Sequence, residues 1–173
     1  MQEQLTFDFE TLEQLADKTQ HLFFVRHGEY SGKDLDTWGR EQIDSIARQI
    51  KETVWELRDG IYICCSTAPR AEQSAEIIAR KLGVDQFERN KKLWTEDNCL
   101  PKDLINHVDT ITNEQLKTNS AVIIVAHYEL GKSYPTHILK TRLKQEGSIR
   151  LLGKGEGAHF DLRDNTYRIL SPT

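Results

Sequence analysis

The sequence predicts a three-layer α/β/α sandwich, in which helices cover both faces of a mainly parallel sheet and the C-terminus adds an antiparallel edge. Short apolar runs of strand length alternate along the chain with amphipathic segments of helix length. The three clearest runs are continuously apolar, as expected of parallel strands that are buried on both faces. The end of the chain differs, because it is typical of a short hairpin.

The first half of the chain contains two strand–helix units. Strands are expected over 21–25 and 61–65, and helices over 38–53 and 68–82. Pro69 falls in the first turn of the second helix, where a missing N–H does no harm. Gly83 follows that helix, in the position where a left-handed residue ends many helices.

The second half continues the alternation. The expected elements are a weaker strand over 87–93, a helix over 104–116, a strand over 121–126, a helix over about 129–145, and terminal strands over 158–162 and 167–170. The run AVIIVA at 121–126 is the clearest buried strand, and Asp164-Asn165 is the expected hairpin turn. Residues 1–20 are expected to form an extension that packs on a domain over 21–173.

Composition restricts the class of protein. The chain has 173 residues, of which 38% are hydrophobic and 29% charged, and this is enough apolar material for one core. A net charge of −4 argues against a nucleic-acid partner. The apolar runs are far shorter than the ~20 residues that span a bilayer, so no membrane insertion is expected. The three cysteines, with Cys64 and Cys65 adjacent, and an acidic N-terminus without a signal-like pattern favour a cytoplasmic protein.

Unusual residues follow the three clearest strands. They are Arg26-His27-Gly28, then Ser66-Thr67 with Arg70 just inside the next helix, and His127. Because the carboxyl ends of parallel strands share one edge of a sheet, these side chains should converge on one crevice. The planar guanidinium of arginine and the backbone N–H groups at helix N-termini are both suited to donate hydrogen bonds to phosphate oxygens. The crevice is therefore expected to bind a phosphoryl group.

The two histidines suit two roles in phosphoryl chemistry. A neutral imidazole can attack phosphorus, and a second, protonated imidazole can stabilise charge on the equatorial oxygens. Protonation of a leaving group also needs a carboxylic acid near the same edge. Glu96 and Asp97, which follow the third strand, are the candidates from the residues alone.

Four segments resemble, in order, the motifs of the histidine phosphatase (phosphoglycerate mutase-like) superfamily. They are LFFVRHGE at 22–29, LDTWGREQ at 35–42, STAPRAEQSA at 66–75 and VAH at 125–127. The resemblance covers roughly residues 20–170. It implies that His27 is the nucleophile that becomes phosphohistidine. It also implies that Arg26, Arg70 and His127 form the phosphate pocket, with His127 taking part in catalysis.

The same resemblance suggests which residue donates the proton and whether a cofactor is needed. Glu96 stands where many members of the family have their proton donor, with Asp97 second and Glu29 a more remote third. The family's chemistry needs no metal or organic cofactor, so none is expected. Tyr30 and Lys33 depart from the usual R-H-G-E-[ST]-x-x-N pattern. Lys33 could still contact phosphate as a point charge, but a solvated loop lysine is the favoured interpretation.

Other residues have simpler interpretations. Trp38 and Trp94 lie beside the motifs, where lining the pocket and packing in the core are equal alternatives. Tyr128 replaces the small residue that usually follows the second histidine, so it should narrow the mouth of the pocket. The remaining histidines are expected to lie away from the site; they are His21, His107, His137 and His159.

The favoured function is a phosphomonoesterase that acts on phosphate esters or on phosphorylated protein side chains. Its partner would be a phosphorylated small molecule or a phosphoprotein, and the sequence is compatible with a homo-oligomer. Phosphoglycerate mutase-type phosphoryl transfer is one alternative, although mutases of this family are longer and enclose their substrate. A phosphate-binding module without catalysis is the other.

Overall fold

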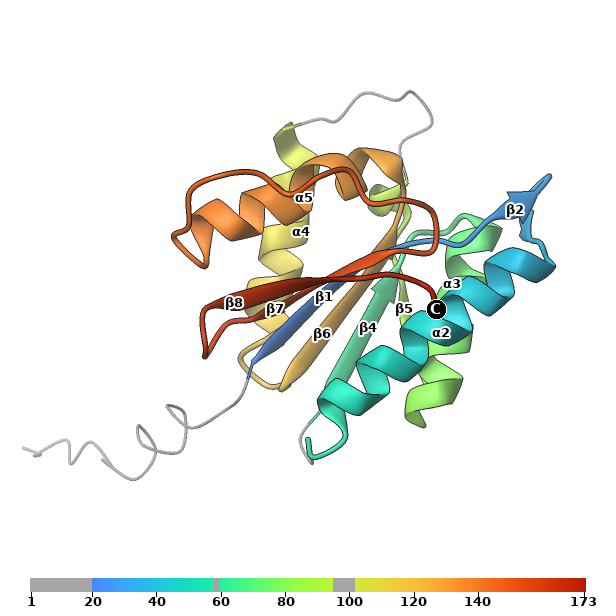
Figure 1. Ribbon diagram of the computed structural model, residues 1–173, viewed down its shortest axis with the longest axis horizontal. Coiled ribbons are helices and arrows are strands. Elements are labelled where there is room, and N and C mark those ends of the chain that lie inside the picture. The colour runs from blue at the N-terminus through green and yellow to red at the C-terminus, as the bar shows by residue number, and fades with distance from the viewer. Residues whose placement is uncertain (1–19, 58–59, 95–101) are drawn as a thin grey trace, which may run out of the picture.

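The sheet at the centre of the molecule has the predicted mixed topology (Figure 1). A computed structural model of the chain describes residues 20–57, 60–94 and 102–173. Within these residues the sheet has six strands in the order β5-β4-β6-β1-β7-β8. The strands are β1 (His21–Arg26), β4 (Ile61–Cys65), β5 (Glu88–Arg89), β6 (Ala121–Ala126), β7 (Gly157–Asp161) and β8 (Thr166–Leu170). The first four of these run parallel, and β7 and β8 form the antiparallel edge, so the predicted fold class is confirmed.

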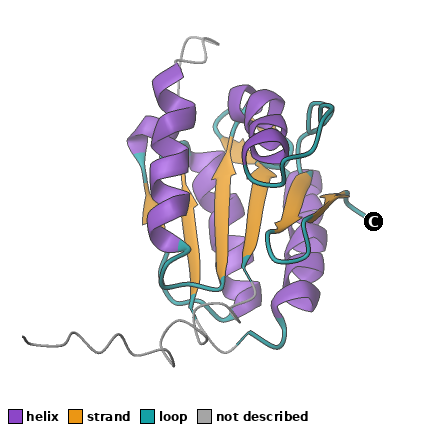
Figure 2. Ribbon diagram, turned by 90° about the vertical axis from the view of Figure 1, so that its left-hand side faces the viewer, coloured by secondary structure: helices purple, strands orange, loops and turns teal. Residues whose placement is uncertain are grey.

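Helices cover both faces of this sheet, as Figures 1 and 2 show. They are α2 (Thr37–Val54), α3 (Pro69–Leu82), α4 (Lys102–Gln115) and α5 (Tyr128–Thr141). Helices α2 and α3 pack on one face and α4 and α5 on the other. Strand β1 contributes Phe23 and Val25 to the first core and Leu22 and Phe24 to the second. Alternate side chains of one strand thus fill two cores, which explains why its sequence is continuously apolar.

The ends of the helices follow from local chemistry. Asp36 caps α2, because its Oδ1 accepts a hydrogen bond of 2.7 Å from the Gly39 N–H. Pro69 occupies the first turn of α3, and Gly83 ends that helix with a φ of 71°. Both features of α3 were predicted from the sequence.

Two predicted boundaries are wrong. The strand expected over 87–93 is only β5, and Lys91–Leu93 form a 3₁₀ helix (η1) instead. The side chain of Asn90 caps η1 by accepting a hydrogen bond of 3.0 Å from the Lys92 N–H. Helix α5 ends at Thr141 and not near residue 145, and the positive φ of 54° at Lys144 takes the backbone out of helical geometry.

Two smaller features complete the description. A short antiparallel ribbon, β2 (Tyr30–Ser31) and β3 (Asp34–Leu35), follows the end of β1. Of the predicted N-terminal extension over 1–20, only Gln20 lies within the described residues. No helix in the described ranges is both long enough and apolar enough to cross a membrane.

Candidate active site

The site lies where the neighbouring parallel strands β1, β6 and β4 end. His27 follows β1, His127 follows β6, and Ser66 follows β4. The imidazole rings of His27 and His127 meet edge to face, with their centroids 5.1 Å apart. The structure therefore brings the two histidines together at one edge of the sheet.

The hydrogen bonds of His27 define which of its nitrogens is free to react. Its Nδ1 lies 2.8 Å from the carbonyl oxygen of Gly28, which can only accept, so Nδ1 carries the proton. The lone pair is therefore on Nε2, which accepts a hydrogen bond of 3.2 Å from Nε of Arg70. The nitrogen suited to attack thus points to a guanidinium, the group that best binds phosphate oxygens.

The surroundings of His27 keep this imidazole neutral. The residue is only 3% exposed, and this burial is the main cause that lowers its pKa to about 4. The positive charges of Arg70, Arg26 and Lys154 lower the pKa further, while the Gly28 carbonyl opposes them. At neutral pH the lone pair of Nε2 is therefore available.

The contacts of His127 favour the opposite tautomer. Its Nε2 lies 2.5 Å from Oγ of Ser66, and that oxygen also accepts a hydrogen bond of 3.4 Å from the Ala68 N–H. The Ser66 hydroxyl can donate its proton to Nε2, an arrangement that places the proton of His127 on Nδ1. Burial lowers the pKa of His127 to about 3. The second imidazole, expected to be protonated, is thus neutral here and offers an N–H donor.

Two buried side-chain nitrogens near the paired histidines have no hydrogen-bond partner within the part of the chain that the structure describes. Among the described residues, Nδ1 of His127 and Nε of Arg26 are the buried side-chain nitrogens without a hydrogen-bond partner. The Arg26 guanidinium also donates to the Leu152 carbonyl at 2.8 Å and lies 5.2 Å from the Tyr128 ring centroid. Buried donors are normally satisfied. An oxyanion with several acceptor oxygens fits these two, and no metal is required for that fit.

The remaining motif residues hold the turn that carries His27. A Cβ on Gly28 would lie 2.4 Å from the Gly39 carbonyl oxygen, and a Cβ on Gly39 would lie 1.9 Å from that of Glu29. The Gln42 Oε1 accepts a hydrogen bond of 2.9 Å from the Glu29 N–H. The glycine and glutamine of the second motif therefore fix the backbone just after His27.

Tyr30, which departs from the family pattern, packs against the charged part of the site. Its ring centroid lies 4.6 Å from the Arg70 guanidinium, 4.7 Å from Nζ of Lys154 and 5.3 Å from the ring centroid of His27. Aromatic faces attract cations, so Tyr30 stabilises both positions. Lys154 also donates a hydrogen bond of 2.7 Å to a carboxylate oxygen of Glu29.

Sequence analysis placed Ser66 at this edge without giving it a role, and it missed Lys154. Ser66 begins the third motif, so its position could have suggested a role beside His127. Lys154 had no comparable signal, because it lies 125 positions from its partner Glu29 and belongs to none of the motifs. Such a contact is visible only in the fold.

Some of the other candidate residues lie within the described part of the chain and some lie outside it. Glu96 and Asp97 lie outside the described residues. Lys33 is exposed, as expected, and Trp38 is 57% exposed, so packing of Trp38 in the core is wrong. Trp94 lies beside the site, with its ring centroid 6.4 Å from that of His127.

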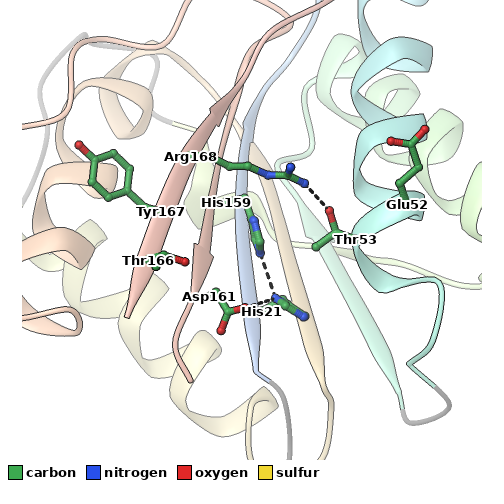
Figure 3. Close-up of a pocket in the computed structure, with 8 residues that line it drawn as sticks. All are labelled: His21, Glu52, Thr53, His159, Asp161, Thr166, Tyr167 and Arg168. Carbon is green, nitrogen blue, oxygen red and sulfur yellow. Dashed lines mark hydrogen bonds and ion pairs between the residues drawn. The ribbon is translucent and has the colours of Figure 1, made fainter. Parts of the chain in front are cut away.

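A second hollow lies at the other end of β1 (Figure 3). It has a volume of about 520 Å³ and is lined by residues of α2, β1, β7 and β8. Here Nδ1 of His21 and Nε2 of His159 are 2.9 Å apart, and the ring of Phe23 stacks on His159. These buried histidines lie away from the edge that carries His27 and His127, as the sequence predicted.

Comparisons with known proteins give a likeness in structure. No family model and no curated protein sequence matches the chain. A protein of Agrobacterium tumefaciens assigned as the phosphohistidine phosphatase SixA superposes with a TM-score of 0.60 at 16% identity, over 89% of this chain and 99% of that one. A mycobacterial glucosyl-3-phosphoglycerate phosphatase gives 0.55 at 16%, over 88% and 97%. The phosphoglycerate mutase of Plasmodium falciparum gives 0.54 at 16%, over 90% and 94%. The chain therefore has the fold of the histidine phosphatase (phosphoglycerate mutase-like) superfamily, the family that its motifs resemble.

Proposed function

We propose that the chain is a phosphomonoesterase that hydrolyses phosphate esters or phosphorylated protein side chains through a phosphohistidine at His27. The state of this imidazole carries the proposal. A buried, neutral histidine has its proton fixed on Nδ1 by Gly28, and its Nε2 lone pair faces Arg70. Structural histidines seldom combine these features with two unpaired donors close by.

In the first half of the reaction, Nε2 of His27 attacks phosphorus and the P–O bond to the leaving group breaks. Arg70 moves its donors from Nε2 to the phosphoryl oxygens, and Arg26 Nε and His127 Nδ1 donate to the same oxygens as negative charge develops. The leaving oxygen takes a proton from a carboxylic acid, and we assign this role to Glu96, with Asp97 as the alternative. Glu29, the third candidate, forms an ion pair with Lys154 in this structure.

The second half reverses these events with water. The carboxylate left by proton transfer accepts a proton from a water molecule, whose oxygen attacks the phosphorus of the phosphohistidine. The N–P bond breaks, its electron pair returns to Nε2 of His27, and inorganic phosphate departs. His27 is then neutral again, with its original tautomer held by Gly28.

Two further expectations belong to this proposal. The catalytic domain would be residues 21–173. Cys64 and Cys65 are both buried, free thiols, which supports a reducing, cytoplasmic location.

Trapping the intermediate tests the proposal. The protein is mixed with p-nitrophenyl phosphate without added metal, quenched in alkali, in which phosphohistidine survives, and examined by intact mass. One added phosphoryl group is expected on the wild type and none on His27→Ala. The matched control is His107→Ala, because His107 is a partly exposed histidine of α4 whose Nε2 contacts Asn90. This variant should keep the label and the rate.

Other outcomes select among the alternatives. A label that persists in His27→Ala would overturn the assignment of the nucleophile. Phosphate binding without turnover by the wild type would favour the binding module. Transfer of the label to 3-phosphoglycerate faster than to water would favour a mutase.

A further inference from the structure

The segment around Lys154 is fixed against the nucleophile. The Gly155 N–H donates to the carbonyl oxygens of both His27, at 2.9 Å, and Arg26, at 3.2 Å. Gly155 has a φ of 70°, and a Cβ there would lie 2.6 Å from the side chain of Gln42, so only glycine allows this close approach. The backbone thus places Lys154 beside the pocket with little freedom.

The side chain of Lys154 lies among groups that contact the nucleophile. Its Nζ donates to Glu29 at 2.7 Å and lies 4.7 Å from the centroid of the Tyr30 ring. The same ring is 4.6 Å from the Arg70 guanidinium and 5.3 Å from the ring of His27. One aromatic side chain therefore connects Lys154, Arg70 and the reacting imidazole.

Lys154 also acts on His27 through its charge. Together with Arg70 and Arg26, it disfavours a proton on His27 and lowers the pKa of that imidazole. A cation near enough to repel one proton there attracts a phosphoryl group at the same atom more strongly, because the group carries nearly two negative charges. The lysine is only partly exposed, so solvent screens this attraction incompletely.

We propose that Lys154 is a third phosphate-binding cation of the site, in addition to Arg26 and Arg70. Glu29 holds the ammonium until a phosphoryl group binds, and the lysine then turns on its flexible stem to donate to a phosphoryl oxygen. Tyr30 provides the aromatic surface along which this change of partner occurs. The inference rests on the proposed function, and it assigns to the site a residue that belongs to none of the sequence motifs.

Binding of inorganic phosphate to the full chain tests this inference without turnover. Titration calorimetry at low ionic strength should show that Lys154→Gln weakens phosphate binding about tenfold or more, the usual effect of losing a charge-assisted hydrogen bond. Lys154→Arg keeps the charge and should stay within about threefold of wild type. The matched control is Lys33→Gln, because Lys33 is an exposed lysine on the turn between β2 and β3. This control removes the same charge and should leave phosphate binding unchanged.

A second variant distinguishes a phosphate ligand from a surface ion pair. Glu29→Gln breaks the same ion pair but leaves the ammonium free, so it should strengthen phosphate binding. If Lys154 is the ligand, this gain should largely disappear in the double variant with Lys154→Gln. If the carboxylate acts only by its own charge, the gain should be the same in both backgrounds, and the inference is overturned.

The test separates failure of this inference from failure of the proposed function. Unchanged phosphate binding by Lys154→Gln, in a protein that still forms phosphohistidine, overturns only the role of Lys154. The expected binding series in a protein that never forms phosphohistidine supports Lys154 and overturns the hydrolase. Failure of the wild type to bind phosphate overturns the role of Lys154, and trapping of phosphohistidine then decides the proposed function independently.

Discussion

Acid should inactivate this protein near pH 4, well below the pH at which an ordinary histidine takes up its proton. In the proposed reaction, nucleophilic attack on phosphorus requires the neutral form of His27. The pKa of this residue is lowered to about 4, chiefly by burial. At pH 5 about 90% of such an imidazole is neutral, whereas a histidine with a pKa of 6.5 would be only about 3% neutral. The pocket therefore gives roughly a 30-fold advantage in reactive nucleophile at pH 5. The lowering of the pKa from 6.5 to about 4 itself corresponds to about 3 kcal/mol against protonation.

The measurement is an NMR titration of ¹³C-labelled histidines between pH 3.5 and 8, with the His27 signal assigned by its loss in His27→Ala. A midpoint near 4 is expected in the folded protein and one near 6.5 in urea. The kcat/KM for p-nitrophenyl phosphate should follow the same acid limb after correction for ionisation of the substrate, because this ratio reports the free enzyme. A folded-state midpoint near 6.5 would refute the reasoning, since it would show that the site does not desolvate its nucleophile.

Three further predictions concern residues outside the reacting atoms. Ser66→Ala should lower kcat about 10- to 100-fold with little change in KM, because the tautomer of His127 is no longer fixed; an unchanged kcat would mean that Ser66 has no part in orienting His127. Gly39→Ala should lower the free energy of unfolding by at least about 2 kcal/mol in urea titrations, since its Cβ would lie 1.9 Å from the Glu29 carbonyl oxygen, and an unchanged midpoint would contradict this contact. Burial also lowers the pKa of His159 to about 4, so between pH 6.5 and 4 the unfolded chain binds more protons than the folded one. Stability should therefore fall by up to about 3 kcal/mol as the pH drops through this window, and His159→Gln should flatten the loss; equal pH dependence in both proteins would show that another group is responsible.

The fold and the centre of the site could be predicted because both depend on local patterns. A continuous apolar run followed by Arg26-His27 indicates a buried parallel strand and the edge at which its carboxyl end lies. Because parallel strands share that edge, His127 is expected there too. The strand order that makes β1 and β6 neighbours was not predicted and comes from the structure.

The features that were missed depend on contacts between distant segments or on weak local preferences. Lys154 reaches Glu29 only because β7 pairs with β1, and no periodicity in the sequence indicates that pairing. The length of the third strand was overestimated because residues 87–93 have only modest β-type character. Asn90 offers the backbone a local hydrogen bond that ends pairing after two residues.

The position of His27 beside a central strand also determines how the protein can move. The amide hydrogens of Arg26 and His27 are bonded to Glu156 and Ala126, on the two neighbouring strands or their ends. Hydrogen exchange at these amides should therefore need global unfolding, and it should be among the slowest in the chain. The backbone at His27 should therefore not open locally. Under the proposed function, substrate entry and phosphate release would depend on side chains at the rim, such as Tyr128, which is 42% exposed.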